Sequence, residues 1–120
     1  EKGANAEAAT ATQKLPLHYA AQNGHTNVAK LLLEKGANAE AVEEDNWTPL
    51  HYAAENGHTD VAKLLLEMGA NAEAVEAQQC TPLHLAARNG RTDVAKLLLE
   101  KGANAEAATA TQKLPLHYAA

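Results

Sequence analysis

Aromatic residues and cysteine are scarce in this chain. Phe is absent, and aromatic residues make up only 3% of the 120 residues. The apolar volume must therefore come from Leu, Ala and Val, which favours closely packed helices over a sandwich of sheets. Cys80 is the only cysteine, so one chain can form neither an internal disulfide nor a thiolate metal cluster.

An excess of positive charge and a long apolar run are missing as well. The net charge is −5, which argues against nucleic acid or an anionic membrane as a partner. No apolar run approaches the roughly 18 residues that a membrane span needs, and no segment resembles a signal peptide. For a natural protein, these features and the single cysteine would fit a cytoplasmic location.

A 33-residue period dominates what the sequence does contain. The tetrapeptide Leu-Pro-Leu-His at 15–18 returns as Thr-Pro-Leu-His at 48–51 and 81–84, then again as Leu-Pro-Leu-His at 114–117. A fixed period of this length is typical of a solenoid, in which each unit packs only on its neighbours. We expect a single domain, 1–120, composed of a partial unit 1–9, full units 10–42, 43–75 and 76–108, and a partial unit 109–120.

The residues of the middle unit predict two short helices. Thr48 can cap the first helix, Pro49 fits its first turn, and Gly57 follows its end. Thr59 is the expected N-cap of the second helix, whose apolar residues recur at i, i+3 and i+4 until Gly69 stops it. A helix pair this short cannot bury both faces alone, so neighbouring units must stack.

These motifs resemble the ankyrin repeat family, and most closely its consensus and designed members. They are Thr-Pro-Leu-His-Tyr-Ala-Ala at 48–54, Asn-Gly-His at 56–58, the Leu-rich segment 61–66 and Gly-Ala-Asn at 69–71. The resemblance covers essentially the whole chain and implies an all-α solenoid of helix-turn-helix units with projecting β-hairpin-like loops. It also implies that partner proteins bind the loop tips and the concave face of the first helices. The imidazoles of the Pro-Leu-His motif are implied to form hydrogen bonds between loops.

Two positions depart from the family pattern. The family usually has Gly two residues before the capping Thr, and the equivalent residues here are Gln13, Asn46, Gln79 and Gln112. Because Gln adopts a positive φ poorly, we expect the hairpin geometry to be perturbed at the three tips that carry it. Leu15 and Leu114 replace the capping Thr, which should cost about 1 kcal/mol per helix start.

A longer period is present too, because residues 1–21 are identical to residues 100–120. Independent drift would not preserve this segment while the intervening units diverge. Neither end has the polar capping repeat that an isolated solenoid needs. We expect either a designed sequence or a window from a longer periodic array, and a natural protein with a recent three-unit duplication is the alternative.

Residues that often carry chemistry have structural explanations in this pattern. The six histidines include four in the Pro-Leu-His motifs, and unit spacing separates equivalent imidazoles instead of gathering them around a metal. Cys80 has no neighbouring base or second cysteine, which argues against a catalytic nucleophile. As a tip residue, Cys80 fits a binding contact or an exposed thiol better. No cofactor, metal site or catalytic residue is expected.

The units differ mainly at their predicted loop tips. Segments such as 10–15 and 43–48 vary while the framework is nearly constant, as expected for a binding surface or for unconstrained drift. Trp47 favours binding, because an exposed Trp on a loop tip is a candidate interface anchor, whereas Tyr19 and Tyr52 fit helix packing better. The candidate partner-binding residues are Lys14, Gln22, Asn23, Glu44, Asp45, Trp47, Glu55, Asn56, Ala77, Gln78, Cys80, Arg88 and Asn89.

The leading hypothesis is a non-catalytic protein-protein interaction module or designed repeat scaffold, which binds an unidentified protein partner. Two alternatives stay open. Head-to-tail stacking of copies would make the chain a structural, self-associating array. A sequence designed only to test repeat folding would have no partner.

Overall fold

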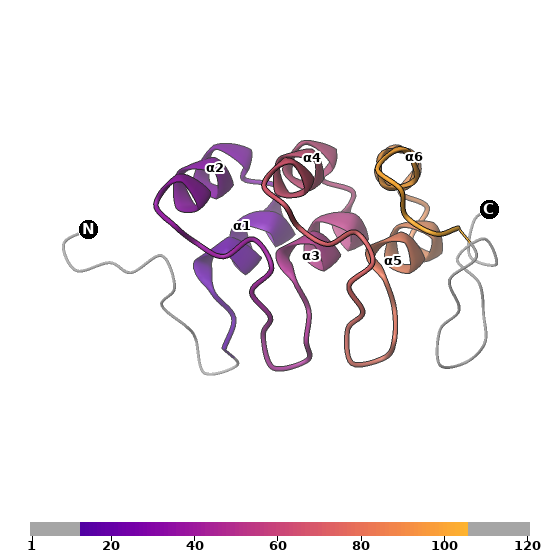
Figure 1. The fold of residues 1–120 in the computed structure, drawn as a ribbon, viewed down its shortest axis with the longest axis horizontal. Helices are drawn as coiled ribbons and strands as arrows, with labels where there is room; N and C mark the ends of the chain where they lie inside the picture. The colour runs from indigo at the N-terminus through magenta and orange to yellow at the C-terminus, as the bar shows by residue number, and fades with distance from the viewer. Residues whose placement is uncertain (1–12, 106–120) are drawn as a thin grey trace.

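The computed structural model describes residues 13–105. Within this range every regular element is a helix, and the helices form three pairs (Figure 1). In chain order they are α1 (Pro16–Asn23), α2 (Thr26–Glu34), α3 (Pro49–Asn56), α4 (Thr59–Glu67), α5 (Pro82–Arg88) and α6 (Thr92–Glu100). This order confirms the predicted all-α helical repeat. The partial units expected at 1–9 and 109–120 lie outside the described residues.

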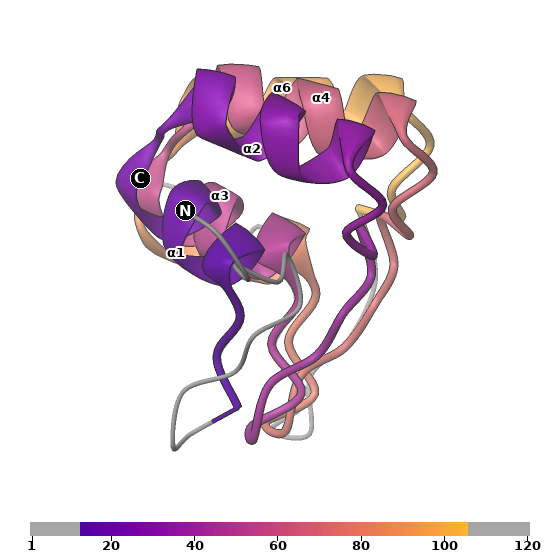
Figure 2. The same cartoon turned by 90° about the vertical axis from the view of Figure 1, so that its left-hand side faces the viewer.

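The helices lie in two layers. The first helices of the units, α1, α3 and α5, pack side by side in one layer, and α2, α4 and α6 form the other (Figure 1). The connections between units extend away from both layers as hairpin-like loops (Figure 2). The three described units are stacked side by side along one direction (Figure 1).

The core runs through all three units. Leu17, Leu50 and Leu83 are the equivalent buried leucines of the first helices, and Leu65 and Leu98 are buried in the second helices. Each such burial stabilises the fold by about 1.5–3 kcal/mol. Two consecutive alanines are also buried in each first helix, and their small side chains let adjacent helices approach closely.

Thr48 caps α3 as predicted, since its Oγ1 accepts a 3.2 Å hydrogen bond from the backbone N–H of His51. Leu15, at the equivalent position before α1, provides no such side-chain cap. Leu114 lies outside the described residues. At its other end α3 stops at Gly57, whose φ of 75° is the left-handed conformation of a helix C-cap.

Thr59 is the first residue of α4 and not its N-cap, so that prediction was wrong by one position. His58 occupies the N-cap position, and its side chain makes contacts between units instead of capping the helix. Its Nε2 donates a 3.0 Å hydrogen bond to the carbonyl oxygen of Gln22, and its ring covers Gly24, where a Cβ would lie 2.6 Å from His58 Nδ1. Arg91 occupies the same position one unit later and covers the next such glycine.

The predicted perturbation is not found in the hairpin at Gln79. Gln13 and Gln79 both adopt a positive φ, of 65° and 69°, which costs about 1–2 kcal/mol for a residue with a Cβ. At Gln79 the turn is nevertheless closed, because Gln79 N donates to Glu76 O at 2.8 Å and Glu76 N donates to Cys80 O at 3.1 Å. The hydrogen bonds of the hairpin therefore override the local preference of Gln. Gln112 lies outside the described residues.

Candidate binding surface

The ends of adjacent loops form a continuous, exposed surface. Glu44 and Asp45 are exposed at one loop end, and Ala77 and Gln78 are exposed at the next. The backbone N–H of Ala77 donates a 2.9 Å hydrogen bond to the carbonyl oxygen of Asp45, which joins the two loops directly. The structure thus brings these four predicted residues together.

A buried carboxylate holds the first of these loops in shape. Glu43 Oε1 accepts hydrogen bonds from the backbone N–H groups of Asp45 at 2.7 Å and Trp47 at 3.0 Å. Its other oxygen, Oε2, accepts a 2.9 Å hydrogen bond from the Tyr52 hydroxyl on α3. Glu43 therefore connects the loop backbone to the helix layer.

Glu76 makes the equivalent contacts in the next loop, where its Oε1 accepts from the backbone N–H groups of Gln78 and Cys80. The interpretation of the sequence missed this role of Glu43 and Glu76, because both were counted with the variable tip segments. The available signal was a Glu at the same position of two units, immediately before the residues that vary.

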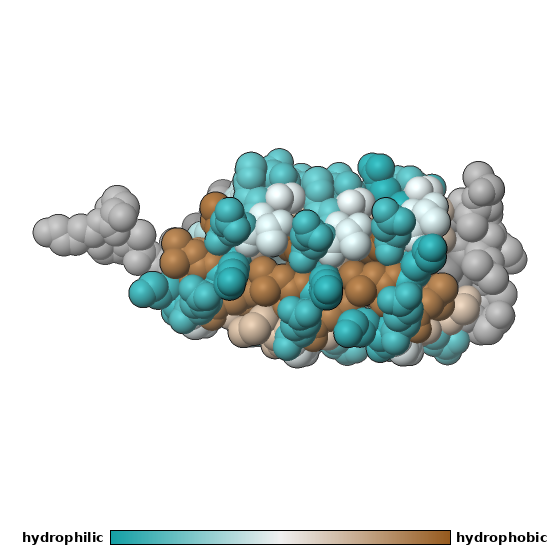
Figure 3. All heavy atoms as spheres, turned by 90° about the horizontal axis from the view of Figure 1, so that it is seen from above, coloured by the Kyte–Doolittle hydropathy of each residue, from teal (hydrophilic) through white to brown (hydrophobic). Residues whose placement is uncertain are grey.

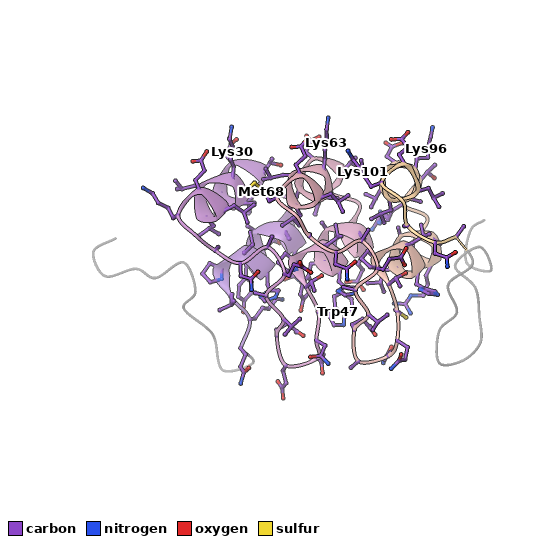
Figure 4. The ribbon with its side chains drawn as sticks, viewed as in Figure 1. Lys30, Trp47, Lys63, Met68, Lys96 and Lys101 are labelled. Atoms are coloured by element: carbon purple, nitrogen blue, oxygen red, sulfur yellow. The ribbon has the colours of Figure 1, made fainter. Side chains whose placement is uncertain are left out.

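Trp47 is not the exposed tip residue that was predicted. Its side chain is half-buried and packs against the core, and Figure 4 shows it between the first-helix layer and the loop ends. The Trp47 ring centroid lies 4.8 Å from that of Tyr52 and 5.7 Å from that of His51. The correction follows from the closed hairpin, which returns toward α3 at this residue.

Cys80 is likewise buried, with 7% of its surface exposed, so the predicted exposed thiol is wrong. Its Sγ lies 3.9 Å from the carbonyl oxygen of Gln78. Burial, followed by the nearby Glu76 carboxylate, raises the pKa of the Cys80 thiol, and Arg88 opposes this only in part. The side chain therefore stays a neutral thiol inside the loop stem.

Lys14 links the first two units on the first-helix side. Its ammonium lies 4.6 Å from the ring centroids of both Tyr19 and Tyr52 and donates a 2.6 Å hydrogen bond to Gln22 Oε1. Tyr52 is 9% exposed, which agrees with its predicted packing role, whereas Tyr19 is 40% exposed. Lys14, Gln22 and the two tyrosines thus form one cluster.

Acidic groups surround the Tyr52 end of this cluster. Burial raises the pKa of the Tyr52 phenol most strongly, and the hydrogen bond to Glu43 and the charges of Glu43, Asp45 and Glu55 raise it further. Each of these effects disfavours a phenolate. The carboxylates of Glu43, Asp45 and Glu55 are thus all close enough to act on this phenol.

The three predicted asparagines have structural roles at the ends of the first helices. In Asn23, Asn56 and Asn89, Nδ2 donates to the backbone carbonyl oxygen four residues earlier, at 2.9, 3.0 and 2.8 Å. Beside them, Glu55 is half-buried and Arg88 is exposed. Their contact with a partner stays a prediction.

Two histidines of the Pro-Leu-His motif, His18 and His51, connect loops, as the family resemblance implied. His51 Nδ1 accepts a 2.9 Å hydrogen bond from Thr48 N, so Nε2 carries the proton and donates to the carbonyl oxygens of Ala74 at 3.0 Å and Cys80 at 3.1 Å. His18 makes the corresponding contacts one unit earlier. Burial lowers the pKa of both imidazoles, which keeps them neutral.

Across residues 13–105, no three His, Cys, Asp or Glu side chains are grouped as metal ligands would be. No helix in the same range has the length and apolar character needed to cross a membrane.

Comparison with known proteins agrees with the geometry. The family model for ankyrin repeats in three copies matches residues 2–76, and the model for a single ankyrin repeat matches residues 78–110. No curated protein matched the chain. Ankyrin repeats are generally protein-protein interaction modules and typically non-catalytic. Two matches that together span most of the sequence, on a stack of helix pairs with joined hairpin loops, show that the chain belongs to the ankyrin repeat family.

Proposed function

We propose that this chain is a non-catalytic binding module that holds a partner protein against its loop ends and the first-helix face beside them. The observation that carries the proposal is the joined pair of loops, in which Ala77 N donates to Asp45 O. Exposed side chains from two units are thereby presented on one surface of fixed shape.

Rigidity of the loops supports this function energetically. Each loop is tied internally by a buried carboxylate, Glu43 or Glu76, that accepts backbone N–H groups on both sides of the turn. A surface ordered before binding loses little conformational entropy on association, which favours affinity. The exposed tip residues differ between the loops while the buried carboxylate is the same, so side-chain identity can vary without altering the framework.

The test is affinity capture with the unaltered chain, called the parent, and with two variants, called the tip variant and the control. The tip variant combines Asp45→Arg with Gln78→Arg, and the control combines Lys30→Ala with Lys63→Ala, two side chains that point away from the first-helix layer (Figure 4). We expect a partner that the parent and the control retain and the tip variant loses. Partners captured equally by all three, or lost only by the control, would contradict the proposal.

Head-to-tail self-association is the second candidate, and unequal exposure at equivalent positions favours it. Val28 is 48% exposed and Leu31 is 54% exposed, whereas Val61 in the next unit is fully buried against its neighbour. Figure 3 shows apolar atoms between the charged side chains on the face formed by the second helices. A second copy could cover the outward face of α2 as α2 itself covers α4.

Light scattering over a wide concentration range separates the two functions. The binding module predicts a constant monomer mass. Self-association predicts a mass that rises with concentration and returns to the monomer value when Val28→Lys and Leu31→Lys are introduced, because buried lysines would oppose stacking.

A further inference from the structure

A positively charged group, the Lys14 ammonium, lies between the rings of Tyr19 and Tyr52. The Lys14 ammonium is 4.6 Å from the ring centroids of Tyr19 and Tyr52, each on a different unit. Trp47 continues the row, with its ring centroid 4.8 Å from that of Tyr52. The described aromatic side chains thus line up along the first-helix face, and a cation lies between two of them.

The charges around this row would also attract a cation. Glu44 and Asp45 are exposed at the adjoining loop end, and Glu55 is half-buried on α3. The chain as a whole carries a net charge of −5. Lys14 is the basic side chain that the structure places between the rings, so an incoming cation would meet negative charge on the side of Asp45 and Glu55.

The third unit lacks this arrangement. Leu85 stands where the first two units have tyrosine, Cys80 replaces Lys14 and Trp47, and Arg88 replaces Gln22 and Glu55. Leu85 is fully buried within the described fold, which shows that leucine is compatible with this helix position. Among the described residues, the tyrosines at this helix position are therefore confined to units 10–42 and 43–75.

We propose that the row Tyr19, Tyr52 and Trp47 receives a Lys or Arg side chain from a basic segment of a partner protein, which takes the place of the Lys14 ammonium. This inference rests on the proposed function and specifies the chemistry of the partner. Tyr19 is 40% exposed and Lys14 is half-buried, so the site opens when the Lys14 side chain rotates away and gives up its hydrogen bond to Gln22 Oε1. An incoming cation at this place would make the same cation–π contacts as Lys14 and meet the same carboxylates of Asp45 and Glu55.

Binding of hexalysine and hexaarginine at low ionic strength tests the proposal, because exposed charge interactions are least screened there. Trp47 is the only tryptophan, so its fluorescence reports on the site directly. Tyr19→Leu leaves the net charge unchanged and introduces the residue found at position 85. We expect it to weaken binding roughly fivefold, while Tyr19→Phe, which keeps the ring, stays within about twofold of the parent. Equal affinity of Tyr19→Leu and the parent would overturn the proposal.

Removal of the resident ammonium gives an independent readout. Lys14→Ala should strengthen hexalysine binding more than Lys35→Ala, which removes the same charge from an exposed position after α2. Equal strengthening by the two variants would mean that only overall charge matters and would contradict displacement. Circular dichroism of each variant checks that the fold is kept.

Failure of this inference is distinguishable from failure of the proposed function. If a captured partner loses affinity for the tip variant at Asp45 and Gln78 and yet binds Tyr19→Leu as tightly as the parent, only the cationic contact is disproved. A partner that binds the tip variant as tightly as it binds the parent would disprove the proposed function itself.

Discussion

The hydroxyl of Tyr52 on α3 donates a 2.9 Å hydrogen bond to Glu43 Oε2, at the base of the neighbouring loop. The same carboxylate accepts the backbone N–H groups of Asp45 and Trp47. One buried side chain therefore sets both the shape of a loop and its position against the first-helix layer. The shape of the loop end therefore depends on contacts of this kind.

Loss of the Glu43 carboxylate should destabilise the protein. Glu43→Ala leaves two loop N–H groups and the Tyr52 hydroxyl without their acceptor, so we expect the free energy of unfolding to fall by about 2 kcal/mol. Urea denaturation measures the change. Glu44→Ala, at the adjacent exposed position, is the matched control and should stay within about 0.5 kcal/mol of the parent. Equal losses in the two variants would rule out the proposed role of Glu43.

Mild acid should also destabilise the fold, through the buried histidines. Burial lowers the pKa of His18 and His51 in the folded state, so the unfolded chain takes up protons first as the pH falls below about 6.5. Stability is therefore full above that pH and declines below it until the folded-state pKa is reached. We expect the Tm in thermal unfolding to fall as the pH is lowered from about 6.5 to 5.

The matched histidine variants identify the residues responsible for that decline. His51→Gln should lower the Tm at neutral pH and flatten its dependence on pH, because one buried titrating group is gone. His25→Gln, at an exposed histidine, is the matched control for the substitution itself. A profile that is equally steep in His51→Gln and in the parent would show that other groups cause the acid effect.

Relief of the positive φ at a loop tip should stabilise the protein. Gln79 has a φ of 69°, and Gly adopts this conformation without a Cβ clash, so Gln79→Gly should add about 1 kcal/mol to the free energy of unfolding. Ala77→Gly, at an exposed position of the same loop, should instead lower it by about 0.5 kcal/mol through added chain entropy. If both variants shift stability in the same direction, the strain at Gln79 is not significant.

The Cys80 thiol should react slowly while the protein is folded. It is 7% exposed and its pKa is raised by burial, so both access and thiolate content are low. Alkylation by iodoacetamide at neutral pH, followed by mass spectrometry, should proceed at least tenfold faster in urea than in buffer. Comparable rates would show that the loop stem opens freely.

The period, the helix pairs and the core were predictable because each unit repeats the same pattern of apolar residues and helix-terminating residues. Leu50 and Leu83 stand at equivalent positions and are both buried, as an apolar pattern with fixed spacing indicates. The orientation of Trp47 and Cys80 was not predictable, because it depends on how a closed hairpin returns toward its own helix. That this member of the family was designed stays a prediction, supported by the identical segments at its two ends.

The hairpin at Gln79 shows where local preference misleads. Gln disfavours a positive φ, yet its turn is held by the backbone bonds to Glu76 and by the Glu76 carboxylate. Recognition of that carboxylate requires contacts between a side chain and backbone N–H groups two and four residues later. A pattern of residue types along the chain carries little information about such contacts.

The dissociation constant of a captured partner for the tip variant tests the central claim most directly. Isothermal titration calorimetry would compare the parent with Asp45→Arg/Gln78→Arg and with the Lys30→Ala/Lys63→Ala control. The loop-end surface predicts a Kd at least tenfold higher for the tip variant, a loss of about 1.4 kcal/mol, with the control unchanged. A tip variant that binds within about twofold of the parent, or a control that loses as much affinity, would contradict it.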